Sequence, residues 1–221
     1  MLRLKEYCDK VRDDAYGGSV ELVEDGITAM ANEIRATEPK DIMTEIEGYV
    51  DSVLAVTSPI LPLIHLLNRC MCFTEESAVG TQKCSDPREA FLELLEEIRQ
   101  EQRQCVDKIG KVGSRLIARR DKVATFSTSG SVMEILKNAV TEGKEITAAA
   151  FEARPNSEGY RTLQEISELG IPVTFGCDAL LCKLVPGSKM FFIGADAISS
   201  TGEVYAKTGS YLAALDRKSV V

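Results

Sequence analysis

The chain has 221 residues, of which 44% are hydrophobic and 27% charged, and its formal net charge is −8. This length suffices for one domain or two small ones, and the composition is that of an ordinary globular protein. The acidic charge argues against direct nucleic acid binding, since affinity for phosphate backbones needs a basic surface. No apolar run reaches membrane-spanning length and the start lacks a secretory pattern, so we expect a cytoplasmic protein without membrane contact.

The seven cysteines are an odd number, and without a secretory signal we interpret them as reduced thiols rather than as disulfides. Cys70, Cys72, Cys84 and the lone His65 lie near one another in the sequence, but their spacing matches no common zinc site. Buried core thiols explain this group better. We therefore expect neither a metal nor another cofactor.

Residues 1 to about 120 are predicted to be helical, because apolar residues recur at every third or fourth position. Gly17-Gly18 ends a first helix, and Ser19 opens a second that runs to about Ile34. Further on, Glu38-Pro39 and the segment Ser58-Pro-Ile-Leu-Pro62 interrupt the helical pattern.

The clearest helix start is Ser85-Asp86-Pro87. Asp86 is a capping residue, Pro87 suits the first helical position, and Glu89 is placed to reach back to the cap. An apolar stripe at helical spacing follows, so a long helix joining the two halves can bury one continuous face. Its members are Phe91, Leu94, Leu95, Ile98, Gln102, Cys105, Ile109, Val112, Leu116 and Ile117.

From Lys122 onward, short β-rich runs alternate with helical patterns of crossover length. The strands are expected at 123–127, 146–151, 172–175 and 190–193, and the helices at 131–142, 157–169 and 178–185. Gly143, Gly170 and Gly187 each follow a helix, where glycine forms a left-handed cap or a turn at least cost. We therefore predict an α/β fold with a helical domain at 1–120 and a Rossmann-like, doubly wound parallel sheet at 121–221.

The segment after the first predicted strand offers hydroxyls and backbone N–H groups at a helix start. It comprises Ser127, Thr128, Ser129, Gly130 and Ser131. A helix start favours an anion, and in a parallel sheet the strand ends and the following helix starts converge on one edge. The alternative is plain capping of the helix by one serine.

After the second predicted strand, Arg154 precedes a proline, and Glu158-Gly159 opens the next helix. A guanidinium held beside helix N–H groups is suited to clamp a phosphate bidentately. The alternative is a surface ion pair of Arg154 with Glu152 or Glu158.

Asp178 and Asp196 follow the third and fourth strands, where a carboxylate can accept sugar hydroxyls or move a proton. Either can instead cap a helix, and for Asp178 we prefer that interpretation. Lys207, with Thr208-Gly209-Ser210 opening the last helix, can hold a second phosphate. The ligand that fits these groups is a phosphorylated sugar or a nucleotide.

Four segments carry a family resemblance: Glu152-Ala-Arg-Pro-Asn-Ser-Glu-Gly159, Leu169-Gly-Ile-Pro-Val-Thr174, Gly194-Ala-Asp-Ala-Ile198 and Lys207-Thr-Gly-Ser-Tyr211. Together they resemble the family of the regulatory alpha, beta and delta subunits of eukaryotic translation initiation factor 2B, archaeal ribose-1,5-bisphosphate isomerase and methylthioribose-1-phosphate isomerase. The resemblance implies a helical N-terminal domain, a Rossmann-like domain through which chains dimerise, and a sugar-phosphate pocket between the domains. It is looser over the first 120 residues.

In the isomerases of this family, a cysteine after the first strand and the aspartate of the Gly-Ala-Asp motif form the catalytic pair. The aspartate corresponds to Asp196, but Ser127 stands at the position of the cysteine, and Ala206 replaces an asparagine. A serine hydroxyl ionises far above a thiol, whose pKa is about 8.5, so Ser127 cannot supply the same thiolate. Cys177, beside Asp178, is either a substitute for that cysteine or a buried structural thiol.

This pattern favours a non-catalytic or regulatory member that binds a sugar phosphate or nucleotide and forms a homodimer or a hetero-oligomer with related subunits. One alternative is a sugar-phosphate isomerase that uses Asp196. Another is a structural module whose Arg154 and Lys207 are held in internal ion pairs. Relatives continue beyond the position of Val221, so we expect a truncated relative or an association that covers the sheet edge near Ser219-Val220-Val221.

Overall fold

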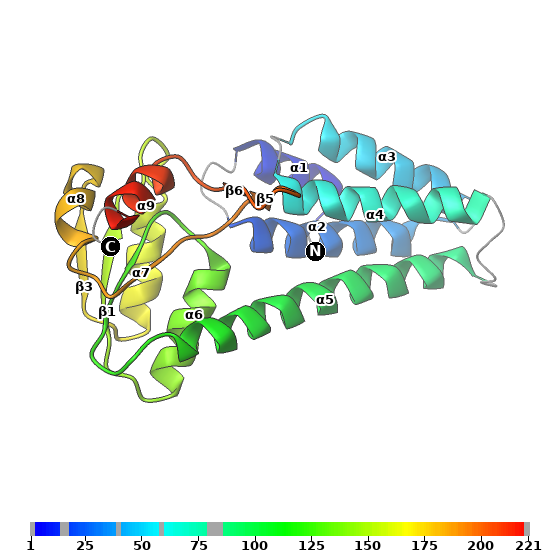
Figure 1. Ribbon diagram of the computed structural model, residues 1–221. Helices are drawn as coiled ribbons and strands as arrows, with labels where there is room; N and C mark the ends of the chain where they lie inside the picture. Colours follow the sequence, from blue (N-terminus) through cyan, green and yellow to red (C-terminus); the bar gives the residue numbers. More distant parts are fainter. Residues whose placement is uncertain (1–2, 14–17, 39–40, 58–59, 79–85, 219–221) are drawn as a thin grey trace. The chain divides into compact units, whose positions relative to one another are not determined.

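The computed structural model describes residues 3–13, 18–38, 41–57, 60–78 and 86–218 (Figure 1). By its contacts the chain divides into two compact units, Met1–Arg103 and Gln104–Val221. This division falls inside the long helix α5, whereas the sequence analysis placed the domain boundary beyond that helix, at residue 120. Outside the described residues lie Gly17, Pro39, Ser58, Pro59, Cys84, Ser85 and the segment 219–221.

The first unit is helical, as expected. Its described elements are α1 (Leu4–Asp13), α2 (Ser19–Ala36), α3 (Ile42–Leu54), α4 (Leu61–Ala78) and the first part of α5 (Pro87–Arg115). Among the helices of the described ranges, none combines the length and the apolar character needed to cross a membrane.

Two buried tyrosines anchor the core of the first unit to α2. The hydroxyl of Tyr7 donates to the carbonyl of Leu22 (2.9 Å), and that of Tyr49 donates to the carbonyl of Gly26 (2.8 Å). A buried hydroxyl without a partner costs about 1–3 kcal/mol, so these bonds determine where both rings lie. Gly26 permits the close contact, because a Cβ there would lie 2.7 Å from the Tyr7 hydroxyl oxygen.

Helix α5 begins as predicted. The backbone N–H of Arg88 donates to Oδ1 of Asp86 (2.9 Å), and Pro87 is the first helical residue. Of the predicted apolar stripe, Phe91 and Leu95 are buried in the core of the first unit.

The C-terminal part of α5 packs differently from the prediction. Three members of the predicted stripe, Ile109, Val112 and Leu116, are exposed, whereas its last member, Ile117, is buried as predicted. The buried positions, again at helical spacing, are Gly110, Gly113, Ser114 and Ile117. A Cβ at Gly113 would lie 2.5 Å from the side chain of Ile135, so two glycines let α5 approach the next helix more closely than any other residue allows.

The second unit contains a four-stranded parallel sheet in the order β3-β2-β1-β4. Its strands are β1 (Lys122–Thr125), β2 (Thr147–Phe151), β3 (Val173–Gly176) and β4 (Met190–Phe192). The connecting elements are α6 (Gly130–Thr141), α7 (Gly159–Glu168), the 3₁₀ turn η2 (Asp178–Leu180) with α8 (Leu181–Leu184), and α9 (Ser210–Lys218) after β4. The predicted strands and helices are confirmed to within about two residues at each end.

Successive side chains of a strand point to opposite faces of the sheet, so each face has its own hydrophobic core. In β2, Ala148 and Ala150 pack with α6 and α7, whereas Ala149 and Phe151 pack with α8 and α9. The predicted doubly wound, Rossmann-like architecture is therefore confirmed. Because all three alanines of this interior strand are small and at most 1% exposed, helices approach the sheet closely on both faces.

An antiparallel hairpin of β5 (Ala197–Ile198) and β6 (Val204–Tyr205) follows the sheet, and the sequence analysis missed it. Gly202 in its loop has φ +88°, a backbone conformation that favours glycine. A polar, glycine-containing loop between two short apolar pairs is the signal that predicts such a hairpin.

Gly26→Ala should lower the free energy of unfolding by about 1–3 kcal/mol, because the added methyl group displaces the Tyr7 hydroxyl from its buried bond. Gly48→Ala in α3 is the matched control, since nothing lies within 4 Å of a Cβ there. It should raise stability by up to about 1 kcal/mol. Urea unfolding of both variants gives the comparison, and equal changes would contradict the packing around Tyr7.

The first unit should also lose stability at alkaline pH. Burial raises the pKa of Cys70 to about 12 and raises the pKa of the Tyr7 hydroxyl above its ordinary value. The unfolded thiol loses its proton above about pH 8.5, so the stabilisation is complete below that pH and is lost as the pH rises. Each such group should contribute a fall of about 1.4 kcal/mol per pH unit.

Denaturant unfolding at about pH 8, 9 and 9.5 measures this fall, since the unfolded tyrosines, with a pKa of about 10, still keep most of their protons there. Cys70→Val should flatten the dependence between about pH 8.5 and 9.5. An unchanged slope in that variant would show that Cys70 is not its source.

Candidate functional site

Loops at the carboxyl edge of the sheet meet in one cluster, formed by Ser127, Glu158 and Lys207. Ser127 follows β1, Glu158 directly precedes α7, and Lys207 precedes α9. The Ser127 hydroxyl donates to Oε2 of Glu158, and Nζ of Lys207 lies 3.5 Å from Oε1 of Glu158. The Asn156 amide donates a longer bond to the same carboxylate (3.4 Å). Because Glu158 is only 5% exposed, these groups replace water around its charge.

The backbone of Ser127 is held in a left-handed conformation, with φ +63°. For a residue other than glycine this costs on the order of 1–3 kcal/mol, and it persists only where neighbouring groups enforce it. The Thr162 hydroxyl donates to the Ser127 carbonyl, and the Thr128 hydroxyl donates to the Glu158 carbonyl, both at 2.9 Å. The two loops are therefore bound to each other through backbone and side chain.

Asp178 determines the position of the loop that carries Arg154. Its two carboxylate oxygens accept the backbone N–H groups of Ala153 (2.9 Å) and Arg154 (2.8 Å). Ala153 has φ +58°, and such a left-handed turn helps two successive N–H groups converge on one anion. The preferred interpretation of Asp178 as a helix N-cap is wrong, because Cys177 holds that position and the Asp178 carboxylate bonds to the neighbouring loop instead.

Both candidate cations have internal partners. Nε of Arg154 lies 3.2 Å from Oε2 of Glu152, and Lys207 pairs with Glu158 as described above. This pairing is what the structural-module alternative predicts. The Arg154 side chain is nevertheless 61% exposed, and an exposed ion pair of this kind contributes only about 0–1 kcal/mol. A ligand phosphate can therefore replace Glu152 as the partner of Arg154 at small cost. The side chain of Lys207 is 43% exposed as well, but its partner Glu158 is buried, so this estimate does not extend to that pair.

The start of α6 presents backbone N–H groups at the same edge. Ser129 is its N-cap, and its hydroxyl oxygen accepts the N–H of Val132 (3.4 Å), so the capping interpretation holds for this serine. Gly130 and Ser131 form the first turn, where N–H groups have no partner within the helix.

Asp196 lies in the loop that follows β4 and is half-buried. Its N–H donates to the carbonyl of Tyr205 (2.8 Å), so the β5–β6 hairpin positions its backbone, and a strand rather than a helix follows it. Gly194, two residues earlier, approaches α6 so closely that a Cβ would lie 2.9 Å from Oγ of Ser129. The Asp196 loop thus runs beside the start of α6.

Two of the predicted ligand residues are glycines for reasons of packing. A Cβ at Gly159 would overlap the carbonyl oxygen of Phe151, and a Cβ at Gly209 would overlap the ring of Phe126. Gly209 also has φ +101°. Ser210, at the start of α9, is 2% exposed. These residues set the course of the backbone at the site whether or not a ligand contacts them.

Cys177 is exposed, so the interpretation as a buried thiol is wrong. It directly follows the edge strand β3, which is separated from β1 by β2. Two strand spacings, about 10 Å, therefore separate it from the position of Ser127.

Elsewhere, Cys70 is buried and Cys72 exposed. Within the part of the chain that the structure describes, no group of three or more His, Cys, Asp or Glu side chains is arranged to hold a metal ion.

The sequence analysis missed Thr162, which is 3% exposed and accounts for one bond between the loops. Its burial could have been predicted from the sequence, because Thr162 lies four residues before Ile166 and therefore on the same, buried face of α7. A threonine on a buried helix face needs a hydrogen-bond partner.

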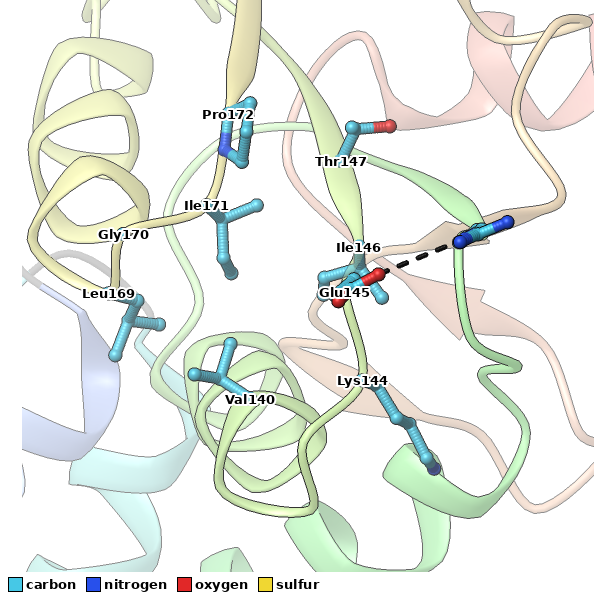
Figure 2. Close-up of a pocket in the computed structure, with 10 residues that line it drawn as sticks. Val140, Lys144, Glu145, Ile146, Thr147, Leu169, Gly170, Ile171 and Pro172 are labelled. Carbon is cyan, nitrogen blue, oxygen red and sulfur yellow. Dashed lines mark ion pairs between the residues drawn. The ribbon is translucent and has the colours of Figure 1, made fainter.

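A separate cavity of about 430 Å³ lies at the opposite, amino edge of the sheet, where α6 and α7 end and β2 and β3 begin (Figure 2). Val140, Leu169 and Ile171 form part of its apolar wall, and Glu145 at its rim lies 3.8 Å from Nε of Arg120. None of the predicted site residues lines it. Ligands of parallel α/β sheets bind at the carboxyl edge, so we do not include this cavity in the site.

A model of the Initiation factor 2 subunit family matches residues 18–219. The chain is 30% identical over 130 residues to ribose 1,5-bisphosphate isomerase of Methanocaldococcus jannaschii, which covers 59% of this chain and 42% of that protein. It is 32% identical over 127 residues to a putative translation initiation factor eIF-2B subunit 2-like protein of Pyrococcus furiosus, covering 58% of this chain and 44% of that one. Both alignments thus span less than half of the relative.

Solved structures show the same fold. The translation initiation factor eIF-2B of Pyrococcus horikoshii OT3 superposes with a TM-score of 0.83 at 21% identity, covering 98% of this chain and 74% of that one. A chain of the tetrameric eIF2B-beta2-delta2 complex from Chaetomium thermophilum superposes with a TM-score of 0.74 at 15% identity, with the same coverage.

Gly159→Ala should destabilise the second unit by more than about 3 kcal/mol, because the methyl group would overlap the backbone of β2. Gly187→Ala is the control, since its nearest contact would be ordinary, at 3.8 Å from the Leu184 carbonyl oxygen. That variant should change stability by less than about 0.5 kcal/mol. Denaturant unfolding followed by circular dichroism measures both, and a stable Gly159→Ala protein would contradict the described path of this loop.

Proposed function

Since the chain belongs to the Initiation factor 2 subunit family, we propose that its second unit binds a phosphorylated sugar or nucleotide at the carboxyl edge without isomerising it. This role is regulatory: binding of the ligand changes how the chain assembles or binds a partner protein, and no reaction of the ligand follows.

The observation that carries this proposal is the state of Ser127. Its hydroxyl stands where the isomerase relatives are expected to have a cysteine, and it donates to the buried Glu158 carboxylate. A hydroxyl bonded in this way stays protonated at neutral pH and offers neither a thiolate nor a thiol acid. The exposed Cys177, two strands away, is badly placed to replace it.

Binding is supported by the groups that converge at this edge. In our proposal the first turn of α6, at Gly130 and Ser131, and the guanidinium of Arg154 hold a phosphate. Helix N–H groups and a guanidinium are both suited to this anion. Asp178 acts as a positioning residue, because it fixes the backbone of Arg154. In our proposal Lys207, with Gly209 and Ser210 at the start of α9, contacts the part of the ligand that lies away from this phosphate.

Isomerisation is the second candidate function, because several relatives are named ribose 1,5-bisphosphate isomerase. In that case Asp196 is the residue that moves the proton. Its half-buried position beside the start of α6 is compatible with this role.

Association with related subunits is also part of the proposal. The support is the similarity in fold to a chain of the tetrameric eIF2B-beta2-delta2 complex. The partner is a second copy of this chain or a related subunit, and a cytoplasmic location fits the translation-factor relatives.

The midpoint temperature of thermal unfolding should rise when a ligand of the site is added. The candidates to test are ribose 5-phosphate, ribose 1,5-bisphosphate, methylthioribose 1-phosphate, AMP and GMP. A ligand at about one hundred times its dissociation constant adds about 2.7 kcal/mol to the stability of the folded state. Arg154→Ala should weaken the binding of an effective ligand at least about tenfold through loss of a charge-assisted contact. Arg119→Ala, which removes an arginine paired with Glu145 near the opposite edge, should leave binding unchanged.

The same preparations separate the two functions through an isomerisation assay on every ligand that binds. We expect no turnover by the wild type. Turnover that Asp196→Asn abolishes would establish the isomerase instead, and the absence of any stabilising ligand would favour the structural module.

A further inference from the structure

We propose that Glu158 is a specificity-determining residue, which makes the site accept a sugar hydroxyl beside Lys207 and reject a second phosphate there. This inference rests on the proposed function, since it concerns the ligand of the same site. It also replaces the expectation that Lys207 holds a phosphate.

Lys207 faces solvent on one side and a buried carboxylate on the other. Its side chain is 43% exposed, so a ligand can reach Nζ, but 3.5 Å away on the protein side lies a carboxylate that is only 5% exposed. Glu158 is tied to its place, because Oε2 accepts the Ser127 hydroxyl and the carbonyl of Glu158 accepts the Thr128 hydroxyl. The negative charge therefore stays beside the ammonium group when a ligand arrives.

The charge balance opposes a phosphate at this position. Glu158 offsets the positive charge of Lys207, and a phosphate dianion in contact with Nζ would lie close to a carboxylate of the same sign. The other site residues add to this effect, since Glu152, Asp178 and Asp196 are carboxylates, and Arg154 is the other cation among them.

A sugar hydroxyl satisfies both members of the pair. Lys207 can only donate hydrogen bonds and an ionised Glu158 can only accept them, whereas a hydroxyl does both. Its oxygen accepts from Nζ while its proton is donated to the carboxylate. A site built from charged hydrogen-bonding groups discriminates strongly against a ligand that cannot complete them.

The ligand class follows from this assignment. One phosphate is held at the start of α6 and by Arg154, and hydroxyls of the sugar face Glu158 and Lys207. The preferred ligand is thus a pentose monophosphate or a nucleoside monophosphate, and a bisphosphate binds less well.

Calorimetric titration with ribose 5-phosphate and ribose 1,5-bisphosphate tests the proposal on the wild type and Glu158→Gln. We expect the wild type to bind the monophosphate at least about tenfold more tightly, and the glutamine variant to lose most of that preference. Glu165→Gln is the matched control. It removes one negative charge from α7, the helix that Glu158 precedes, where Glu165 pairs with Arg161 (2.8 Å), and it should leave the preference unchanged.

A second variant gives a test that does not depend on Glu158→Gln folding well. If a hydroxyl lies beside Lys207, Lys207→Gln should weaken both ligands by a similar factor. A selective loss of the bisphosphate in Lys207→Gln would place its second phosphate there and overturn the proposal. So would a wild type that prefers the bisphosphate, or a preference that Glu158→Gln leaves intact. Failure of the wild type to bind either ligand would instead overturn the proposed function, and this inference with it.

Discussion

The site at the carboxyl edge depends on one steric constraint, the contact between Gly159 and the carbonyl of Phe151. Only a residue without a side chain fits there, so α7 starts directly against the end of β2. That contact turns the intervening loop back on itself. Glu158 thereby accepts the Ser127 hydroxyl, and Asp178 accepts the backbone N–H of Arg154. The arrangement of the proposed phosphate site is therefore a consequence of backbone packing that exists without a ligand.

Local rules predicted the parallel strands and crossover helices of the second unit, and these predictions are confirmed. They also predicted the start of α5 in the first unit, where Asp86 accepts the backbone N–H of Arg88. The errors share one physical cause, which is that side-chain partners come from distant segments. Asp178 has a carboxylate that any capping rule would accept, yet a neighbouring loop presents two N–H groups to it. Along α5, the apolar periodicity continues through Val112 and Leu116, but these residues are exposed. Glycines of α5 make the contact with α6 instead.

The candidate site was predictable as a set of residues but not as a network. Sequence order shows that Ser127, Glu158 and Lys207 all lie near strand ends. It does not predict that Glu158 contacts both Ser127 and Lys207, because these contacts depend on how deeply each side chain is buried and where it points in the folded chain. The relatives of this chain include a protein named as an isomerase and one named as a putative translation initiation factor subunit. One fold can thus carry different functions, and in our proposal Ser127 is the side chain that separates the two alternatives here.

The three consecutive alanines of β2 have a further consequence for how this protein can diverge. They lie in an interior strand with helical layers pressed against both faces, and they are essentially inaccessible. Any larger side chain would push a whole helix away from the sheet and shift every loop attached to it. Substitutions by larger residues in the middle of the sheet are therefore poorly tolerated, and new ligand preferences have to arise from the loops at the edge of the sheet. A single substitution at a strand end can alter the chemistry of the site while the sheet beneath it stays the same.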